Sequence, residues 1–147
     1  MISFSQQRGG AIKAMGSVIV NSNLAANAST TSLLDTNGNV VTLSGNITGT
    51  GTINIQSLPL GNAVRFTTTG TQIVNPVITG ATELQKSGTG TTTLTAVSSH
   101  SGDFFVDGGR LNLATGSSIA SNIEVTGAAT TIGGEGTSTN SMLFNAG

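Results

Sequence analysis

The sequence predicts an all-β fold, a right-handed parallel β-helix (β-solenoid) of roughly six or seven coils. Gly, Thr, Ser and Asn make up 75 of the 147 residues. Thr, with Val and Ile, favours extended backbone, whereas Gly and Asn favour turns. Runs of β-forming residues also recur roughly 20 residues apart, a spacing typical of solenoids; they begin at Val40, Val64, Leu84, Phe104 and Ile123.

The individual strands are predicted from short runs of β-formers that lie between Gly, Asn and Asp residues. The clearest turns are Asn37-Gly38 and Asp107-Gly108-Gly109. Residues 25–32 are the best place for a short helix or an irregular loop, and little helix is expected elsewhere. We expect strands near residues 17–20, 40–44, 52–55, 63–68, 73–78, 83–86, 91–95, 103–106, 110–113, 122–125 and 141–144.

A narrow core of small and medium apolar side chains is expected inside the coils, which fits an aromatic content of only 3%. At about 4.8 Å per coil the rod would be about 30 Å long. The alternative is an antiparallel β-sandwich, although sandwiches usually have more aromatic anchors and more charged outer faces. The predicted inward residues are Val18, Val20, Val41, Leu43, Ile53, Ile55, Val64, Phe66, Ile73, Ile78, Leu94, Leu111, Leu113, Ile123 and Val125.

Charge and cysteine content exclude several classes of function. Only 7% of residues are charged, the net charge is −1, and the five Lys and Arg residues are scattered along the chain. No basic stripe is therefore present to bind nucleic acid or a membrane surface. The chain has no Cys, so it contains neither a disulfide nor a thiolate zinc site. Its apolar stretches are only a few residues long, which predicts no membrane insertion of this segment.

The ionisable side chains predict no catalytic, cofactor or metal site. Asp103 and Asp107 would lie about 13 Å apart on an extended strand, too far for a glycosidase pair. His100 is the only histidine, and its polar loop predicts a solvated side chain. The remaining acids are Asp35, Glu83, Glu124 and Glu135. We therefore expect no enzyme activity; an enzyme acting on polysaccharide is the alternative. A more distant one is an ice-binding solenoid, suggested by Thr triplets at 67–69 and 91–93.

Residues 84–113 carry a more specific pattern, LQKSGTGTTTLTAVSSHSGDFFVDGGRLNL. Two Leu-containing β runs are joined by Gly-rich turns, and Lys86 precedes Gly88 and Gly90. This arrangement resembles the passenger-associated strand repeat of bacterial autotransporters. It departs from the family pattern at Thr92, where Leu is usual, and at the bulky Phe104-Phe105. The Asn/Thr/Gly texture of the whole chain is similar to rickettsial surface cell antigens.

The resemblance implies that residues 1–147 are a single solenoid fragment of an autotransporter passenger. It implies a structural stalk or adhesin on the bacterial surface, attached to the outer membrane through a barrel outside this chain. The ligand would lie on a host cell or another surface, and no cofactor is implied. Neither end of the expected solenoid resembles a polar cap, so end-to-end self-association is also expected.

Overall fold

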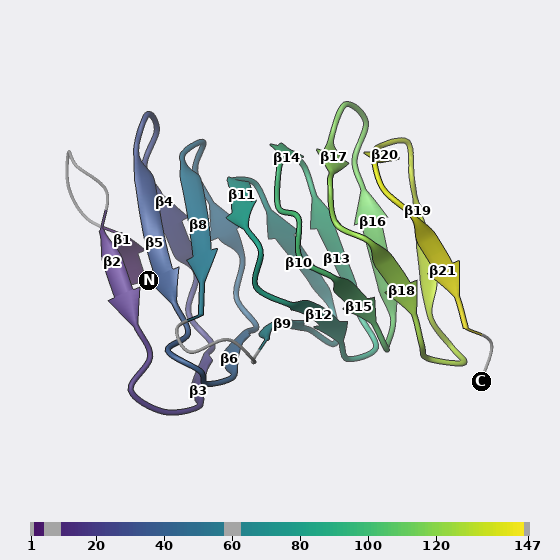
Figure 1. The fold of residues 1–147 in the computed structure, drawn as a ribbon, viewed down its shortest axis with the longest axis horizontal. Helices are drawn as coiled ribbons and strands as arrows, with labels where there is room; N and C mark the ends of the chain where they lie inside the picture. Colours follow the sequence, from purple (N-terminus) through teal and green to yellow (C-terminus); the bar gives the residue numbers. More distant parts are fainter. Residues whose placement is uncertain (1, 5–9, 58–62, 146–147) are drawn as a thin grey trace.

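The computed structural model describes residues 2–4, 10–57 and 63–145, which form short β-strands and turns with no helix. Successive strands lie on three faces, and one strand from each face completes one coil of a solenoid (Figure 1). The coils follow one another along the long axis, so the two ends of the chain lie at opposite ends of the rod. This part of the chain has no helix that is long and apolar enough to cross a membrane.

Seven strands form the first face and seven form the third. The first comprises β1 (Ile2–Phe4), β4 (Leu24–Ala26), β7 (Ile47–Thr48), β10 (Thr71–Val74), β13 (Thr91–Leu94), β16 (Arg110–Leu113) and β19 (Thr131–Gly134). The third comprises β3 (Val18–Val20), β6 (Val41–Leu43), β9 (Val64–Thr67), β12 (Leu84–Ser87), β15 (Phe104–Val106), β18 (Ile123–Val125) and β21 (Met142–Phe144). These strand numbers agree with the predicted six or seven coils.

The second face is divided into two sheets, with strands of three to five residues in the first and of two residues in the second. It begins with a sheet of β2 (Ala11–Lys13), β5 (Thr31–Asp35), β8 (Thr52–Gln56) and β11 (Val77–Gly80). It continues with β14 (Val97–Ser98), β17 (Ser118–Ile119) and β20 (Thr137–Ser138). The sequence predicted only β8 and part of β11 on this face. The two-residue strands leave almost no alternation to detect, and the helix or loop expected over residues 25–32 overlaps the start of β5.

The coils stack in register through parallel pairing. Leu84 pairs with Phe104, a step of 20 residues, and Ile123 pairs with Met142, a step of 19. Between Ile47 and Val74 the step widens to 27 residues. Every strand pair of the described residues is parallel, which confirms the β-solenoid and rules out the antiparallel sandwich.

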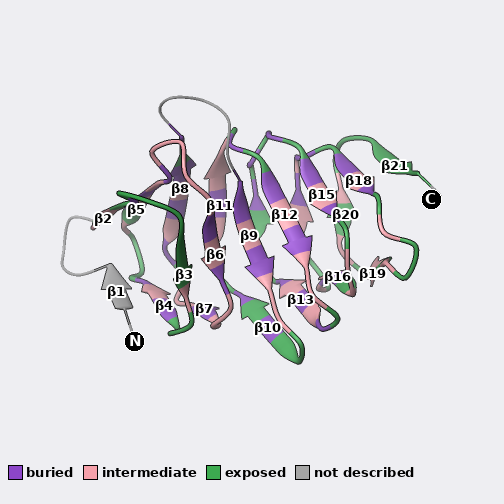
Figure 2. Cartoon of the chain, turned by 90° about the horizontal axis from the view of Figure 1, so that it is seen from below, coloured by how far each residue is buried: buried purple, intermediate pink, exposed green. Residues whose placement is uncertain are grey.

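The core is a narrow apolar column inside the three faces (Figure 2). Of the fifteen residues predicted to point inward, twelve are buried and Val20 is half-buried. Ile73 is wrong, with an exposed fraction of 40%; Val18 shares the inward column of the buried Val41 but is 42% exposed. Val18 lies on β3, which is paired on one side only. Ile73 points outward because side chains alternate along β10 and its neighbours Gln72 and Val74 are the buried ones.

Two predicted elements also differ from the structure. Residues 25–32 contain no helix; they comprise the end of β4, a turn and the start of β5. Leu24 and Ala26 are buried, and β4 pairs with strands on both sides, so the ladder overrides any local helix preference. The strand predicted over 73–78 is divided into β10 and β11 at Pro76, which has no N–H to continue a ladder.

Close stacking of the turns makes some glycines essential. A Cβ at Gly90 would lie 2.2 Å from the carbonyl oxygen of Gly70 in the preceding coil, whereas a Cβ at Gly70 meets nothing within 4 Å. We predict that Gly90→Ala lowers the free energy of unfolding by about 1–3 kcal/mol, because the backbone of one turn must shift. Gly70→Ala is the matched control and should stay within about 0.5 kcal/mol of wild type in urea denaturation. Equal effects of the two variants would contradict this account.

Candidate functional site

The most distinctive site is the corner where the third face turns into the first within residues 84–113. We call residues 87–90 and 107–109 the repeat corner. Gly88 and Gly109 have φ angles of 77° and 65°, in the left-handed region that glycine adopts most easily. The backbone N–H of Arg110 donates to the carbonyl of Gly90 over 3.1 Å, so the two successive turns are bonded to each other.

Lys86 is buried beneath the repeat corner, with its side chain 0% exposed. Its register partners on β9 and β15 are Phe66 and Val106, so a cationic residue occupies an otherwise apolar column. The Nζ atom donates to the carbonyls of Ser87 (2.7 Å), Gly88 (3.1 Å) and Gly108 (3.0 Å). All three ammonium hydrogens are thereby used, and they join the turns of two successive coils.

Burial lowers the pKa of Lys86, and the carboxylate of Asp107 partly opposes this by favouring the charged form. Asp107 is exposed and accepts a hydrogen bond from Nε2 of Gln85. Gln85 in turn accepts from Nε of Arg65 over 2.7 Å. A polar row therefore crosses three coils on the third face and ends at Asp107 in the corner.

An open recess of about 470 Å³ lies over this corner. Its lining includes one ionisable side chain, Asp107, and no aromatic ring. The recess can offer hydrogen bonds to a polar partner, but it brings together neither an acid–base pair nor a stacking platform for a sugar. It is lined by Gly88, Thr89, Asp107, Gly108, Gly109, Ala129 and Thr130.

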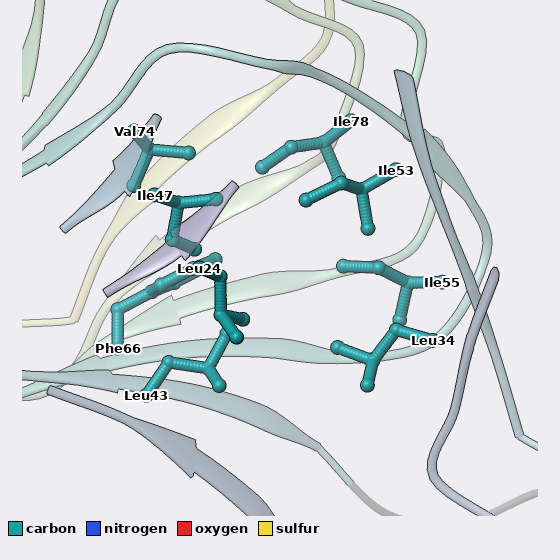
Figure 3. A pocket seen from close by; sticks show the side chains of 9 residues that line it. All are labelled: Leu24, Leu34, Leu43, Ile47, Ile53, Ile55, Phe66, Val74 and Ile78. Carbon is teal, nitrogen blue, oxygen red and sulfur yellow. The ribbon is translucent and has the colours of Figure 1, made fainter. Parts of the chain in front are cut away.

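A second cavity, inside the N-terminal half of the rod, is a packing gap (Figure 3). Its volume is about 10 Å³, which is roughly one water-sized probe. Nine apolar side chains line it and no polar atom faces it, so it offers a ligand neither room nor orientation. The lining side chains are Leu24, Leu34, Leu43, Ile47, Ile53, Ile55, Phe66, Val74 and Ile78.

His100 is not solvated as its loop predicted; its side chain is fully buried. Nε2 lies 2.7 Å from the carbonyl oxygen of Thr82, and Nδ1 lies 2.8 Å from Oγ of Ser121. A carbonyl only accepts, so Nε2 carries the hydrogen, and in the neutral ring Nδ1 accepts from the Ser121 hydroxyl, whose hydrogen it shares with the more distant carbonyl oxygen of His100 at 3.2 Å. Burial lowers the pKa of His100, against a smaller opposing effect of the bond to Thr82. The ring therefore joins three successive coils in its neutral form.

Gln72 is a buried polar residue that the sequence did not single out. Its Nε2 donates to the carbonyls of Leu43 (2.9 Å) and Gly45 (2.8 Å), and its Oε1 accepts from Thr92 Oγ1 at 3.0 Å. The amide thus spans the widest step between coils, where β7 is too short to pair along all of β10. Strict alternation backward from Ile78 would have placed Gln72 inward.

The acidic residues lie apart along the rod. Asp103 and Asp107 flank β15 at opposite ends, and Oδ1 of Asp103 accepts from Asn122 Nδ2 at 3.1 Å. Asp35 lies 3.6 Å from Lys13 Nζ, and Glu135 accepts from Thr115. In the described part of the chain, no three His, Asp or Glu side chains gather as metal ligands. The absence of catalytic, cofactor and metal sites stays a prediction.

The Thr triplets do not form the rows that ice binding would require. Along the first face, Thr71 and Thr91 are followed by Arg110 and then Thr131. In the neighbouring outward column, Thr93 lies between Ile73 and Asn112. Arg110 therefore interrupts the first column, and Asn112 interrupts the second.

Residues 84–113 match the family model described as passenger-associated-transport-repeat. This match, together with the β-solenoid, fits an autotransporter passenger repeat; it does not extend to a rickettsial type of passenger. Neither the comparison with curated proteins nor that with solved structures gives a match. The matched segment runs from Leu84 on β12 to Leu113 on β16, and it contains the whole repeat corner.

Replacing Lys86 by Met tests the corner directly. Met preserves the apolar stem but removes the ammonium, which leaves carbonyls at the corner without their donor. We predict a loss of about 1–3 kcal/mol in the free energy of unfolding. Lys13→Met is the matched control: the Lys13 side chain is 56% exposed where it pairs with Asp35, and the pair should contribute less than about 1 kcal/mol. An unaltered urea midpoint for Lys86→Met would argue against a stabilising role.

His100 predicts a pH dependence of stability. Because its folded-state pKa is lowered, the unfolded chain binds the proton more readily. The associated stability is present above the unfolded value of about 6.5 and is lost as pH falls below it. The thermal midpoint should therefore be lower at pH 5.5 than at pH 7.5. His100→Gln, which removes the only histidine, should abolish most of this difference; an equally large fall in the variant would assign it to other groups.

Proposed function

We propose that this chain is a non-catalytic segment of an autotransporter passenger, displayed on the bacterial cell surface as part of a stalk or adhesin. The observation that carries the proposal is the matched repeat at 84–113, which lies within the stacked coils and whose corner is bonded to its neighbours. The repeat suggests a passenger with a β-helix structure, and the stalk role is inferred from the rod.

The absence of cysteine supports export. An oxidising compartment such as the periplasm would form disulfides in a Cys-containing passenger before it crossed the outer membrane. As a segment of a passenger, the chain would be attached to that membrane through a barrel outside its 147 residues. The present fold needs no cross-link, because the described strands already pair along the rod.

An adhesive role is supported by the chemistry of the lateral faces. Thr is the most frequent outward residue, the third face adds Arg65, Gln85 and Glu124, and the recess over the repeat corner adds backbone and hydroxyl groups. Such a surface suits a partner that is recognised by hydrogen bonds and shape. The expected ligand is a host-cell or other surface molecule.

Fusion to a barrel domain of an unrelated autotransporter tests both parts of the proposal. We expect residues 1–147 to reach the surface of intact Gram-negative cells, where external protease removes them and an antibody detects them. Purified chain coated on beads should then bind host cells more than beads carrying the Gly90→Ala variant. Retention in the periplasm would contradict the passenger role. Surface display without binding would agree with a stalk role and contradict the adhesin role.

A further inference from the structure

We propose that copies of this chain associate head to tail, with β21 of one copy pairing in parallel with β3 of the next. The proposal concerns residues 1–147 as a separate chain, in which the outer edges of β3 and β21 are unpaired, and it does not depend on a cell-surface role. It commits to a second copy of the chain as the partner.

Exposed apolar side chains are concentrated on the first and last coils. In the described part of the chain, eight large apolar residues are exposed, and six of them belong to these two coils. Only Ile73 and Val97 lie on the sides of the rod. The six are Met15, Val18 and Ile19 at one end and Met142, Leu143 and Phe144 at the other. Clustering of this kind marks a surface for association.

The side-chain columns of the third face define the register of the junction. Met142 and Phe144 continue the inward columns of Ile123 and Val125. At the opposite end, Val18 and Val20 begin the inward columns of Val41 and Leu43. Pairing Leu143 with Ile19 would place Met142 on Val18 and Phe144 on Val20. Both inward columns would then run on into the next copy.

The free backbone groups require the same register. Asn145 donates to Val125 and Ser141 accepts from Ile123, so the N–H and C=O groups of Met142 and Phe144 point away from β18. On β3, Val18 donates to Val40 and Val20 accepts from Ser44, which leaves the groups of Ile19 on the open edge.

These two edges are complementary. In parallel pairing Ile19 can donate to Met142 and accept from Phe144, which again places Leu143 opposite Ile19. A slip of one residue would spoil both the backbone pairing and the columns.

Neither strand carries the features that usually block edge pairing. β3 reads VIV and β21 reads MLF, with no Pro and no charge. Native sheets commonly use Lys, Pro or bulges at open edges to prevent such contacts. Because the contact joins different surfaces of two copies and adds each copy along the long axis of the rod, the products should be open chains of variable length.

Cysteine cross-linking provides the sharpest test, because the chain has no Cys of its own. Adjacent strands bring paired Cα atoms within about 5 Å, which a disulfide can bridge. A mixture of Leu143→Cys and Ile19→Cys chains should give a disulfide-linked dimer under mild oxidation, and the double variant should give a ladder of higher masses. Val97→Cys mixed with Ile19→Cys is the control and should cross-link little.

The pattern of products decides among the possible contacts. Strong cross-linking of Leu143→Cys chains to one another would indicate a symmetric end-to-end contact and reject the proposed register. Equal cross-linking in the Val97→Cys control would indicate random collision and also reject it.

Sedimentation gives an independent measurement. Phe144 and Val97 are both 64% exposed, so their Lys variants introduce a charge at equally accessible positions. Phe144→Lys should weaken association about tenfold or more, and Val97→Lys should leave it unchanged. A mixture of Phe144→Lys with Ile19→Lys should stop at dimers. The first variant keeps only its β3 edge and the second only its β21 edge, so one pairing uses up both. A monomeric wild type at high concentration would overturn the proposal.

Discussion

Parallel pairing of each coil with the next is the interaction on which the rest of the structure depends. The strands are only two to five residues long, so none could persist in isolation. Each gains its partners from coils about 20 residues away in either direction. The step between coils sets which residues share a column, and whether that column points into the core or out to solvent. Core, corners and outer faces therefore all follow from the register.

Buried polar side chains fix that register more tightly than the apolar core can. Val, Ile and Leu tolerate small shifts, whereas Lys86, Gln72 and His100 each bond to atoms of a neighbouring coil. If one coil slipped by a residue, these groups would be buried without partners, at a cost of about 1–3 kcal/mol each. This explains why a narrow solenoid core contains a lysine, an amide and an imidazole.

Much of the fold could be predicted from the sequence, because the dominant signal is periodic. Columns such as Val41, Val64 and Leu84 are visible as repeated β runs, and they located the third face well. On the second face, Ser118–Ile119 and Thr137–Ser138 were missed because they are too short for alternation to appear, and Thr31–Asp35 was missed because a helix or loop was expected over its first residues. Ile73 was misplaced because its apolar character favours an inward position, whereas its place in the alternation of β10 makes it point outward.

The candidate site was less predictable than the fold. Lys86 and the glycines around it were recognised as a family pattern, but their role depends on carbonyls of the next coil, Gly108 included. For His100, the neighbouring sequence is entirely polar, so nothing local indicates that Thr82 and Ser121 enclose it. Contacts between coils join residues about 20 positions apart, and no short motif records them.

The division between a constrained interior and permissive sides bears on function. Inward positions must satisfy the columns, and corner positions such as Gly90 must admit the backbone of the preceding coil. Outward positions on the three faces meet only solvent and their neighbours in the next coil, where Thr, Asn, Gln and Arg pair with one another. A rod built this way can change its outer residues without losing its register, which suits a scaffold that presents a surface to a partner.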